Sequence, residues 1–501
     1  MRDLNPLRRA ALRPLAAALA LAGASAAGCA DVSEENLDTV VQDIEVSLRP
    51  GQSLAQAINA ARPGDRLLVP AGTYAGGGWI EARGTASAPI TIVSADGPRR
   101  AVIEGGSESL RIGASSYLVF DGFEVRGAAN NAVHIDDSDH ITLRNLYAHD
   151  AGRDGDVVKV NQSRAIVVER SELARPGART GGENPYQECL DFVDVDDGVI
   201  RDNFIHDGGS MLMFVKGGSR NTVIERNVFT QQRAGASDPM VGLGGPTDPE
   251  LLDGEQFEAI NIVFRNNVVV GGAAGAIAVY DAQGAFIANN LLLDNNRVLV
   301  EFRAGEGPAG RSEDVRVVNN LMVDTRGRMP EVFRRSSHGL TGLVTSHNLY
   351  WNNGAALPST ALVSLAAQPG HLNANPGISA PANVGDLAAV LAATRPASAS
   401  PAANSGTDAS AAPFGVTTDI LGVARAGRRD RGPFHLAAAS SASTGSAGTP
   451  PPATTSATGT SGSSNNGGTA NNGGTADPPR APVSIQFWLA RIFLSFTSAQ
   501  R

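Results

Sequence analysis

From about residue 74 to about residue 350 the sequence repeats one short pattern: a pair of apolar, mostly β-branched residues, a polar turn and then an asparagine. A repeat of about 22–24 residues, with insertions in some copies, is typical of a solenoid, and its short strands make it a β-solenoid. Each copy buries its apolar side chains only against the neighbouring copies, so many copies must stack. Asparagines at one turn are expected to form a ladder in which each amide bonds the next coil. Five of them are Asn203, Asn227, Asn267, Asn290 and Asn320, at successive intervals of 24, 40, 23 and 30 residues.

The sequence around these repeats resembles the right-handed parallel β-helix proteins of the pectate-lyase-like superfamily. The resemblance rests on the runs PGQSLAQAINAARPGDRLLVPAGTY and GTASAPITI and on the asparagine turns, and it covers roughly residues 46–437. Ser53 begins a capping-box sequence, and Leu54, Ile58 and Ala61 then fall on one helical face. The predicted fold is all-β: a single-stranded right-handed parallel β-helix, or solenoid, with an N-terminal capping helix.

Residues 1–29 have the form of a bacterial lipoprotein signal peptide, with a basic start, an apolar stretch and small residues before Cys29. Cys29 is the predicted lipidation site; ordinary cleavage after Ala27, which would give a secreted protein, is the alternative. We therefore expect an exported protein, anchored to the cell envelope at the outer membrane or cell surface, whose membrane contact is only the lipid on Cys29. Beyond the signal peptide the predicted segments are a polar tether (30–45), the β-helix domain (46–437), a disordered Ser/Thr/Gly/Asn-rich linker (438–482) and a short apolar tail (483–501).

The charged residues and the cysteines exclude several classes of protein and indicate where chemistry could occur. The chain has 41 basic and 50 acidic residues and a net charge of −9, which argues against a nucleic-acid partner. Its two cysteines exclude a disulfide scaffold and a cysteine-ligated zinc site. Lys159 and Lys216 are the only lysines, and all other basic residues are arginine. Because lysine can lose its proton in a suitable environment and arginine cannot, these two positions are candidates for chemistry.

Alignment of the repeats places His134, Lys159 and Asp191 at one outward position of three successive coils, about 4.8 Å apart. Lys216 joins this row if its turn is one residue shorter than in the other coils. Met213 and Val215 then point inward, whereas the unshifted register would instead bury Leu212, Phe214 and the lysine itself. We favour the shifted register, because burying a lysine without a partner is costly. Both lysines are therefore expected on one face, two coils apart.

Two insertions, 174–187 and 230–256, leave after the same strand of their coils and are expected to form the walls of a groove beside this row. A solvated, charge-balanced face without a ligand is the alternative interpretation. A groove of this kind suits an acidic polysaccharide. β-Elimination at a uronic acid requires a cation that neutralises the sugar carboxylate and a base that removes the C5 proton. Calcium or arginine can supply the first, and a lysine whose pKa nearby cations lower can supply the second.

The segment from Phe214 to Asn221 resembles the element that carries the base lysine in β-helix polysaccharide lyases of the chondroitinase B and alginate lyase type. The family has acidic calcium ligands where this chain has Gly209 and Met211, and it has a shorter turn after the lysine. The resemblance implies Lys216 as the base. The residues predicted to act with it are Lys159 and Asp191 in catalysis, Asp156, Glu188 and Asp191 as possible Ca²⁺ ligands, and His134, Asn161 and Arg220 in substrate binding.

Two other classes of function stay open. A non-catalytic surface solenoid that binds carbohydrate or protein is the first alternative to a polysaccharide lyase. A glycoside hydrolase is the second, since Asp191 with Asp194 or Asp197 could supply the two carboxylates that such an enzyme needs. In each case we expect a monomer.

Overall fold

The computed structural model describes residues 45–48, 51–177, 187–252, 254–336 and 338–436. The predicted signal peptide with Cys29, all but the last residue of the tether, the linker and the apolar tail lie outside these ranges, so those predictions stay predictions. Within the described ranges no helix combines the length and the apolar character that a membrane crossing requires.

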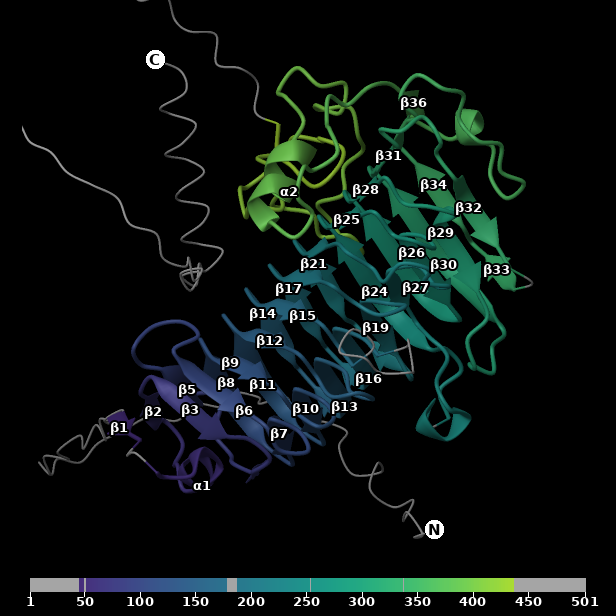
Figure 1. Cartoon of the computed structure of the whole chain (residues 1–501). Helices are drawn as coiled ribbons and strands as arrows, with labels where there is room; N and C mark the ends of the chain where they lie inside the picture. The colour runs from purple at the N-terminus through teal and green to yellow at the C-terminus, as the bar shows by residue number, and fades with distance from the viewer. Residues whose placement is uncertain (1–44, 49–50, 178–186, 253, 337, 437–501) are drawn as a thin grey trace, which may run out of the picture. The chain divides into compact units, whose positions relative to one another are not determined.

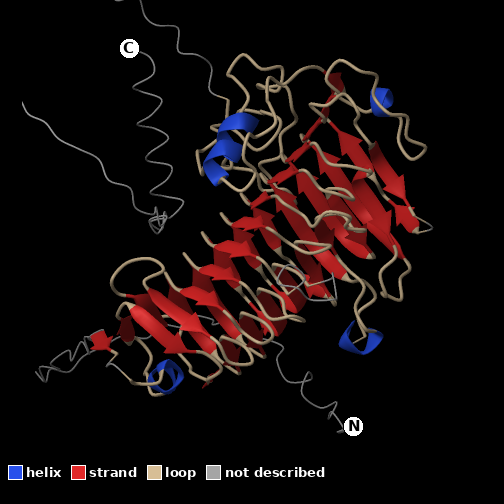
Figure 2. Ribbon diagram, viewed as in Figure 1, coloured by secondary structure: helices blue, strands red, loops and turns tan. Residues whose placement is uncertain are grey.

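The described strands form two sheets, one of 24 and one of 12 strands, and each strand pairs in parallel with strands of the coils before and after it. This is the predicted parallel β-helix (Figures 1 and 2). The smaller sheet comprises β3 (Gly72–Ala75), β6 (Ala101–Glu104), β9 (Glu124–Arg126), β12 (Tyr147–His149), β15 (Glu172–Ala174), β18 (Phe204–His206), β22 (Val228–Phe229), β25 (Val268–Val270), β28 (Leu291–Leu293), β31 (Leu321–Val323), β35 (Leu349–Trp351) and β36 (Leu372–Asn373).

Strands of the larger sheet lie along two sides of the coil. One series is β4 (Trp79–Ile80), β7 (Leu110–Gly113), β10 (Val133–Asp136), β13 (Val158–Arg164), β16 (Leu190–Asp196), β19 (Met213–Lys216), β23 (Val241–Leu243), β26 (Ile277–Tyr280), β29 (Val298–Arg303) and β32 (Glu331–Arg335). The others are β1 (Glu45–Ser47), β2 (Arg66–Val69), β5 (Ile90–Ser94), β8 (Ser116–Asp121), β11 (Asp139–Arg144), β14 (Val167–Glu169), β17 (Val199–Arg201), β20 (Ser219–Arg220), β21 (Val223–Glu225), β24 (Ala259–Arg265), β27 (Ala282–Ala288), β30 (Arg311–Val318), β33 (Gly339–Thr341) and β34 (Val344–Ser346).

The two ends of the solenoid are covered differently. The predicted capping helix is α1 (Leu54–Asn59), with Ser53 as its N-cap and with Leu54 and Ile58 buried. At the other end the chain folds back on the outer face of the 12-stranded sheet. There α2 (Leu387–Thr394) and the segment after it pack on the outward side chains of the later coils, such as Leu291 and Leu321. Two short 3-10 helices lie at Pro249–Leu252 (η1) and Leu365–Ala367 (η2).

The asparagine ladder is confirmed. The backbone N–H of Asn227 donates to Oδ1 of Asn267 (2.9 Å), and Nδ2 of Asn267 donates back to the carbonyl of Ile224 (2.9 Å). The same pattern links each member to the next, so backbone groups that a sharp turn would leave unpaired are satisfied inside the stack. The ladder contains Asn203, Asn227, Asn267, Asn290, Asn320 and Asn348.

Replacement of one interior member of this ladder is expected to destabilise the solenoid. Asn267→Ala leaves the N–H of Asn227 without its partner in a fully buried site and removes the amide's hydrogen bond to the carbonyl of Ile224, at a cost of about 1–3 kcal/mol in the free energy of unfolding. Urea unfolding checks this against Asn296→Ala, because the side chain of Asn296 is exposed, accepts a hydrogen bond from Arg326 and does not belong to the ladder. Equal stabilities of the two variants would contradict a structural role for the ladder.

Candidate functional site

The strand register confirms the predicted row of outward side chains. His134 pairs with Lys159, and Lys159 pairs with Asp191, on three successive coils. Their neighbours alternate with them and point inward: Val158, Val160, Leu190 and Phe192 are fully buried. We call this line of positions the first row.

The predicted position of Lys216 is wrong by two residues along its strand. Phe214 pairs with Asp191 and continues the first row, and Lys216 pairs with Val193. The turn after Lys216 is one residue longer than its neighbour, not shorter, because Gly217 and Gly218, with φ of 67° and 83°, form a bulge that most other residues would adopt only with strain. The predicted parity is nevertheless correct, since Met213 and Val215 are buried inside the coil and Lys216 points outward.

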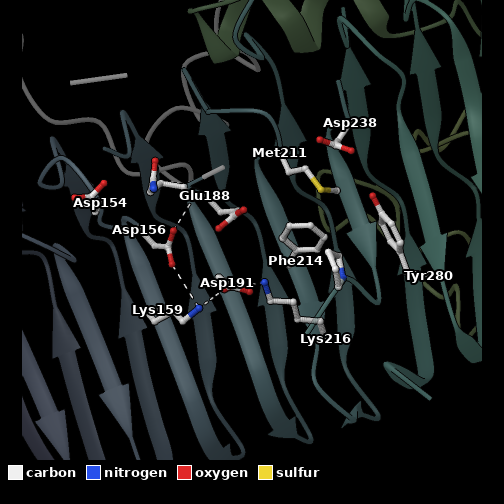
Figure 3. A pocket seen from close by; sticks show the side chains of 12 residues that line it. Asp154, Asp156, Lys159, Glu188, Asp191, Met211, Phe214, Lys216, Asp238 and Tyr280 are labelled. Carbon is white, nitrogen blue, oxygen red and sulfur yellow. Dashed lines mark hydrogen bonds and ion pairs between the residues drawn. The ribbon is translucent and has the colours of Figure 1, made fainter. Parts of the chain in front are cut away.

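The two lysines converge on one buried carboxylate (Figure 3). Nζ of Lys159 forms an ion pair with Oδ2 of Asp191 and lies 3.6 Å from Oδ2 of Asp156. Nζ of Lys216 reaches the same Oδ2 of Asp191 at 3.4 Å. The other oxygen of Asp191, Oδ1, is buried and accepts no hydrogen bond from the described residues, and Asp191 as a whole is only 1% exposed. The chain's only two lysines, on β13 and β19, thus share a partner on β16, the strand between them.

Asp191 belongs to a triad of buried acids. One carboxylate oxygen each from Asp156, Glu188 and Asp191 lie within 4.8 Å of one another. Asp156 and Glu188 occupy equivalent positions two residues before β13 and β16, and the Glu188 N–H donates to Oδ1 of Asp156 at 2.8 Å. The structure therefore brings together all three predicted metal ligands.

Burial and mutual repulsion separate the acidities of these three groups. Burial, followed by the charges of Asp156 and Asp191, raises the pKa of Glu188 well above its usual value, and burial likewise raises the pKa of Asp156. Burial also opposes ionisation of Asp191, but the charges of Lys159 and Lys216 outweigh it and lower the pKa of Asp191. Opposed shifts in neighbouring carboxyls are a feature of functional sites.

The expectation that Lys216 has a lowered pKa is wrong for the protein without a bound ion. Burial disfavours the charged form of Lys216, but the negative charges of Asp191 and Glu188 outweigh this and raise the pKa. The pKa of Lys159 is raised for the same reason, chiefly by Asp191 and Asp156 against the effect of burial. The acids expected here as Ca²⁺ ligands therefore raise the pKa of Lys216 when no ion is bound, and their charge outweighs that of the neighbouring Lys159.

Two cavities of about 400 Å³ each meet at Lys159, Lys216 and Pro246. The first has the acidic triad on one side and the apolar side chains of Met211, Phe214 and Tyr280 on the other (Figure 3). The second cavity lies toward the C-terminal ends of the same strands. Its lining includes Asp136, Asn161, Val193, Thr247 and Leu251.

The predicted groove wall is confirmed for one of the two insertions. Residues 230–256 supply Asp238 to the first cavity, Leu251 to the second and Pro246 to both, although part of this segment, β23, adds a further strand to the sheet. Residues 178–186 of the other insertion lie outside the described residues, and Gln187 at its end lines the first cavity.

The three predicted substrate-binding residues differ from one another in their position relative to the two cavities. Asn161 lines the second cavity. His134 lies in the first row, where its ring contacts Glu108, Asp136 and Asn161. Arg220 is engaged by Glu255 and by Asp196, and it lines neither cavity.

Sequence reasoning missed the apolar wall of the site. Tyr280 lies in β26, one coil beyond β23, and its ring is 6.1 Å from that of Phe214. Arg303 donates to the Tyr280 hydroxyl at 3.2 Å and forms an ion pair with Asp238 at 2.6 Å. Extension of the coil alignment past Asn267 would have found Tyr280. Asp238 could not be found in this way, because it lies in the insertion 230–256, where the coil alignment gives no register.

No family model and no curated protein matches this chain. The solved structures similar to it include an alginate lyase from Paenibacillus sp. str. FPU-7 (22% identity over 61% of this chain and 98% of that one, TM-score 0.43). They also include pectate lyase Pel9A (16% identity over 77% of this chain and 91% of that one, TM-score 0.46). A third is a mannuronic acid specific polysaccharide family 6 lyase from human gut microbiota (16% identity over 61% of this chain and 81% of that one, TM-score 0.41). These neighbours are parallel β-helix proteins. The parallel pairing of the strands in both sheets defines the fold of this chain.

Proposed function

We propose that this protein is a polysaccharide lyase that cleaves an acidic, uronic-acid-containing polysaccharide by β-elimination. The observation that carries the proposal is the convergence of the chain's only two lysines on one buried carboxylate, at the junction of two cavities. A line of cavities suits a polymer better than a single small molecule. Paired ammonium groups at their junction suit a ligand that carries carboxylates.

The roles follow from position. Lys159 is less buried than Asp191 and keeps a raised pKa, so its ammonium group is suited to neutralise the uronate carboxylate. Lys216 is the base: its amine, once deprotonated, takes the C5 proton, and the C5–H electron pair forms the C4–C5 double bond. The bond from C4 to the glycosidic oxygen breaks, and that oxygen departs with the bonding pair and takes a proton from solvent. Asp191 fixes both lysines by their shared ion pairs, which limits the geometries available to the amine.

The residues present fit a calcium ion. Oxygens of three carboxylates lie within 4.8 Å of one another, and one buried oxygen of Asp191 has no hydrogen-bond partner among the described residues. The raised pKa of Glu188 reflects repulsion from Asp156 and Asp191 that a cation would relieve. Asp156, Glu188 and Asp191 would hold the ion. When bound, calcium supplies positive charge for the substrate carboxylate. Neutralisation of the acids also removes the attraction that keeps Lys216 protonated, which makes Lys216 a better base.

Removal of one charge of the triad should distinguish two effects on stability: repulsion between the acids in the metal-free protein, and stabilisation by bound calcium. Glu188→Gln keeps the size of the side chain but relieves the repulsion from Asp156 and Asp191, so the metal-free variant should unfold at a higher temperature than the wild type. Calcium should raise the melting temperature of the wild type and raise that of the variant less. Asp197→Asn, at a half-exposed site outside the triad, serves as the control. An undiminished response to calcium in Glu188→Gln would contradict this metal site.

The reaction is tested with a panel of uronic-acid polysaccharides, including polygalacturonate, alginate and chondroitin sulfate, with calcium and with chelator. Rising ultraviolet absorbance from the new double bond, lost in Lys216→Ala, is the expected result. New reducing ends without absorbance would identify a glycoside hydrolase, and no change in either would contradict both enzymes.

One observation favours a second candidate, a non-catalytic solenoid that binds an acidic glycan. Both lysines have raised pKa values in the metal-free site, and a protonated amine binds carboxylates but removes no proton. This candidate predicts saturable binding of a polysaccharide without any product.

A further inference from the structure

The first row continues beyond the candidate site to an exposed tryptophan. Lys159 pairs with His134, His134 with Arg111, and Arg111 with Trp79 of β4. Trp79 therefore stands at the equivalent outward position three coils away from Lys159, about 14 Å along the solenoid. It is 47% exposed, although Trp is ordinarily among the more buried residue types.

The structure around Trp79 holds its side chain in place. An added Cβ at Gly113 would lie 2.3 Å from two ring carbons, Cη2 and Cζ2, so the indole occupies space over β7 that only glycine leaves free. The guanidinium of Arg111 packs 5.0 Å from the ring centroid. Asn59 of α1 fixes the backbone, because its Nδ2 donates to the Trp79 carbonyl and its Oδ1 accepts from the Glu81 N–H, both at 2.9 Å.

A continuous polar path joins this ring to the lysines. The second cavity extends from Lys216 and Lys159 through Asn161 to Asp136. Asp136 forms an ion pair with Arg111, and Arg111 also pairs with Glu108 at 2.8 Å. Because its charge is already matched by these two acids, Arg111 is better suited to support the indole than to bind a ligand carboxylate.

We propose that Trp79 is a distal subsite for the same acidic polysaccharide, with the indole stacked against the C–H face of a sugar ring. The inference takes its substrate class from the proposed function, and it concerns binding rather than catalysis. A sugar ring presents apolar C–H bonds on one face, which an exposed aromatic ring can cover. Continuity of the row makes the occupant another part of the chain bound at Lys159 and Lys216, and only a long oligosaccharide reaches both places.

The test compares size-graded oligosaccharides of polygalacturonate, alginate and chondroitin sulfate in the full-length Lys216→Met background, in which no cleavage disturbs the titration. Trp79→Ala should weaken binding of long oligosaccharides about three- to tenfold and leave that of the shortest binding oligosaccharide unchanged. Gly113→Ala, which keeps the tryptophan but displaces its ring, should act in the same direction. Val344→Ala, an exposed apolar residue outside the first row, is the matched control and should have no effect.

The outcomes separate this subsite from the lyase reaction. Equal losses for short and long oligosaccharides, or no loss for either, would overturn the Trp79 subsite and leave the lyase intact. Length-dependent loss in a protein whose wild type forms no unsaturated product would support the subsite and contradict the lyase. A wild type that binds none of these oligosaccharides would overturn both.

Discussion

Lys216→Arg is expected to lower kcat at least about a hundredfold, because removal of the C5 proton requires an amine that can be neutral and a guanidinium stays protonated. The variant keeps the positive charge facing Asp191, so its loss of activity cannot be ascribed to a lost ion pair. Lys159→Arg is the matched control. It should keep much of the activity, because a permanent cation can still neutralise the sugar carboxylate.

The measurement is steady-state kinetics of all three proteins on the best substrate of the panel, with melting temperatures recorded to confirm folding. Lys216→Met adds a variant that has neither a base nor a charge. Full activity of Lys216→Arg would exclude Lys216 as the base. Equal losses in Lys216→Arg and Lys159→Arg would assign both lysines to positioning or binding.

Asp191→Ala should have the largest effect on stability within the site. It leaves the ammonium groups of Lys159 and Lys216 largely buried without their shared partner, and such an uncompensated charge typically costs about 3–5 kcal/mol. Residual attraction from Asp156 and Glu188 places the expected loss at the lower end, about 3 kcal/mol. Denaturant unfolding at neutral pH measures it.

A second variant shows whether that loss comes from charge. Asp191→Ala combined with Lys216→Met removes one of the two stranded ammonium groups, so part of the lost stability should return. Asp197→Asn, whose carboxylate pairs with an exposed Arg164, should change stability little. If the double variant is less stable than Asp191→Ala, the charge argument fails and the loss reflects packing.

The fold was predictable because its two determinants are local and repeated. Alternating apolar residues assign each side chain to the inside or outside of the coil, and the recurring asparagine marks one turn of each coil. His134, Lys159 and Asp191 could therefore be placed in register without a structure.

Lys216 shows where this reasoning fails. Parity along a strand is set by adjacent residues, but register between coils depends on the length of each turn, and the Gly217–Gly218 bulge adds one residue. The raised pKa of Lys216 was equally hidden from the sequence. It depends on the distance and shared burial of Asp191 and Glu188, which coil counting alone does not supply. Trp79 was missed because the predicted row began at His134, and β4 lies two coils earlier.

The most direct test of the central claim is the mass of the products that the wild-type protein releases from a defined uronic-acid oligosaccharide. β-Elimination breaks the chain without adding water, so the masses of the two products should sum to that of the substrate, and one product should carry the double bond. Products whose masses sum to that of the substrate plus one water would show hydrolysis and contradict the assignment of Lys216 as a base for C5 proton removal.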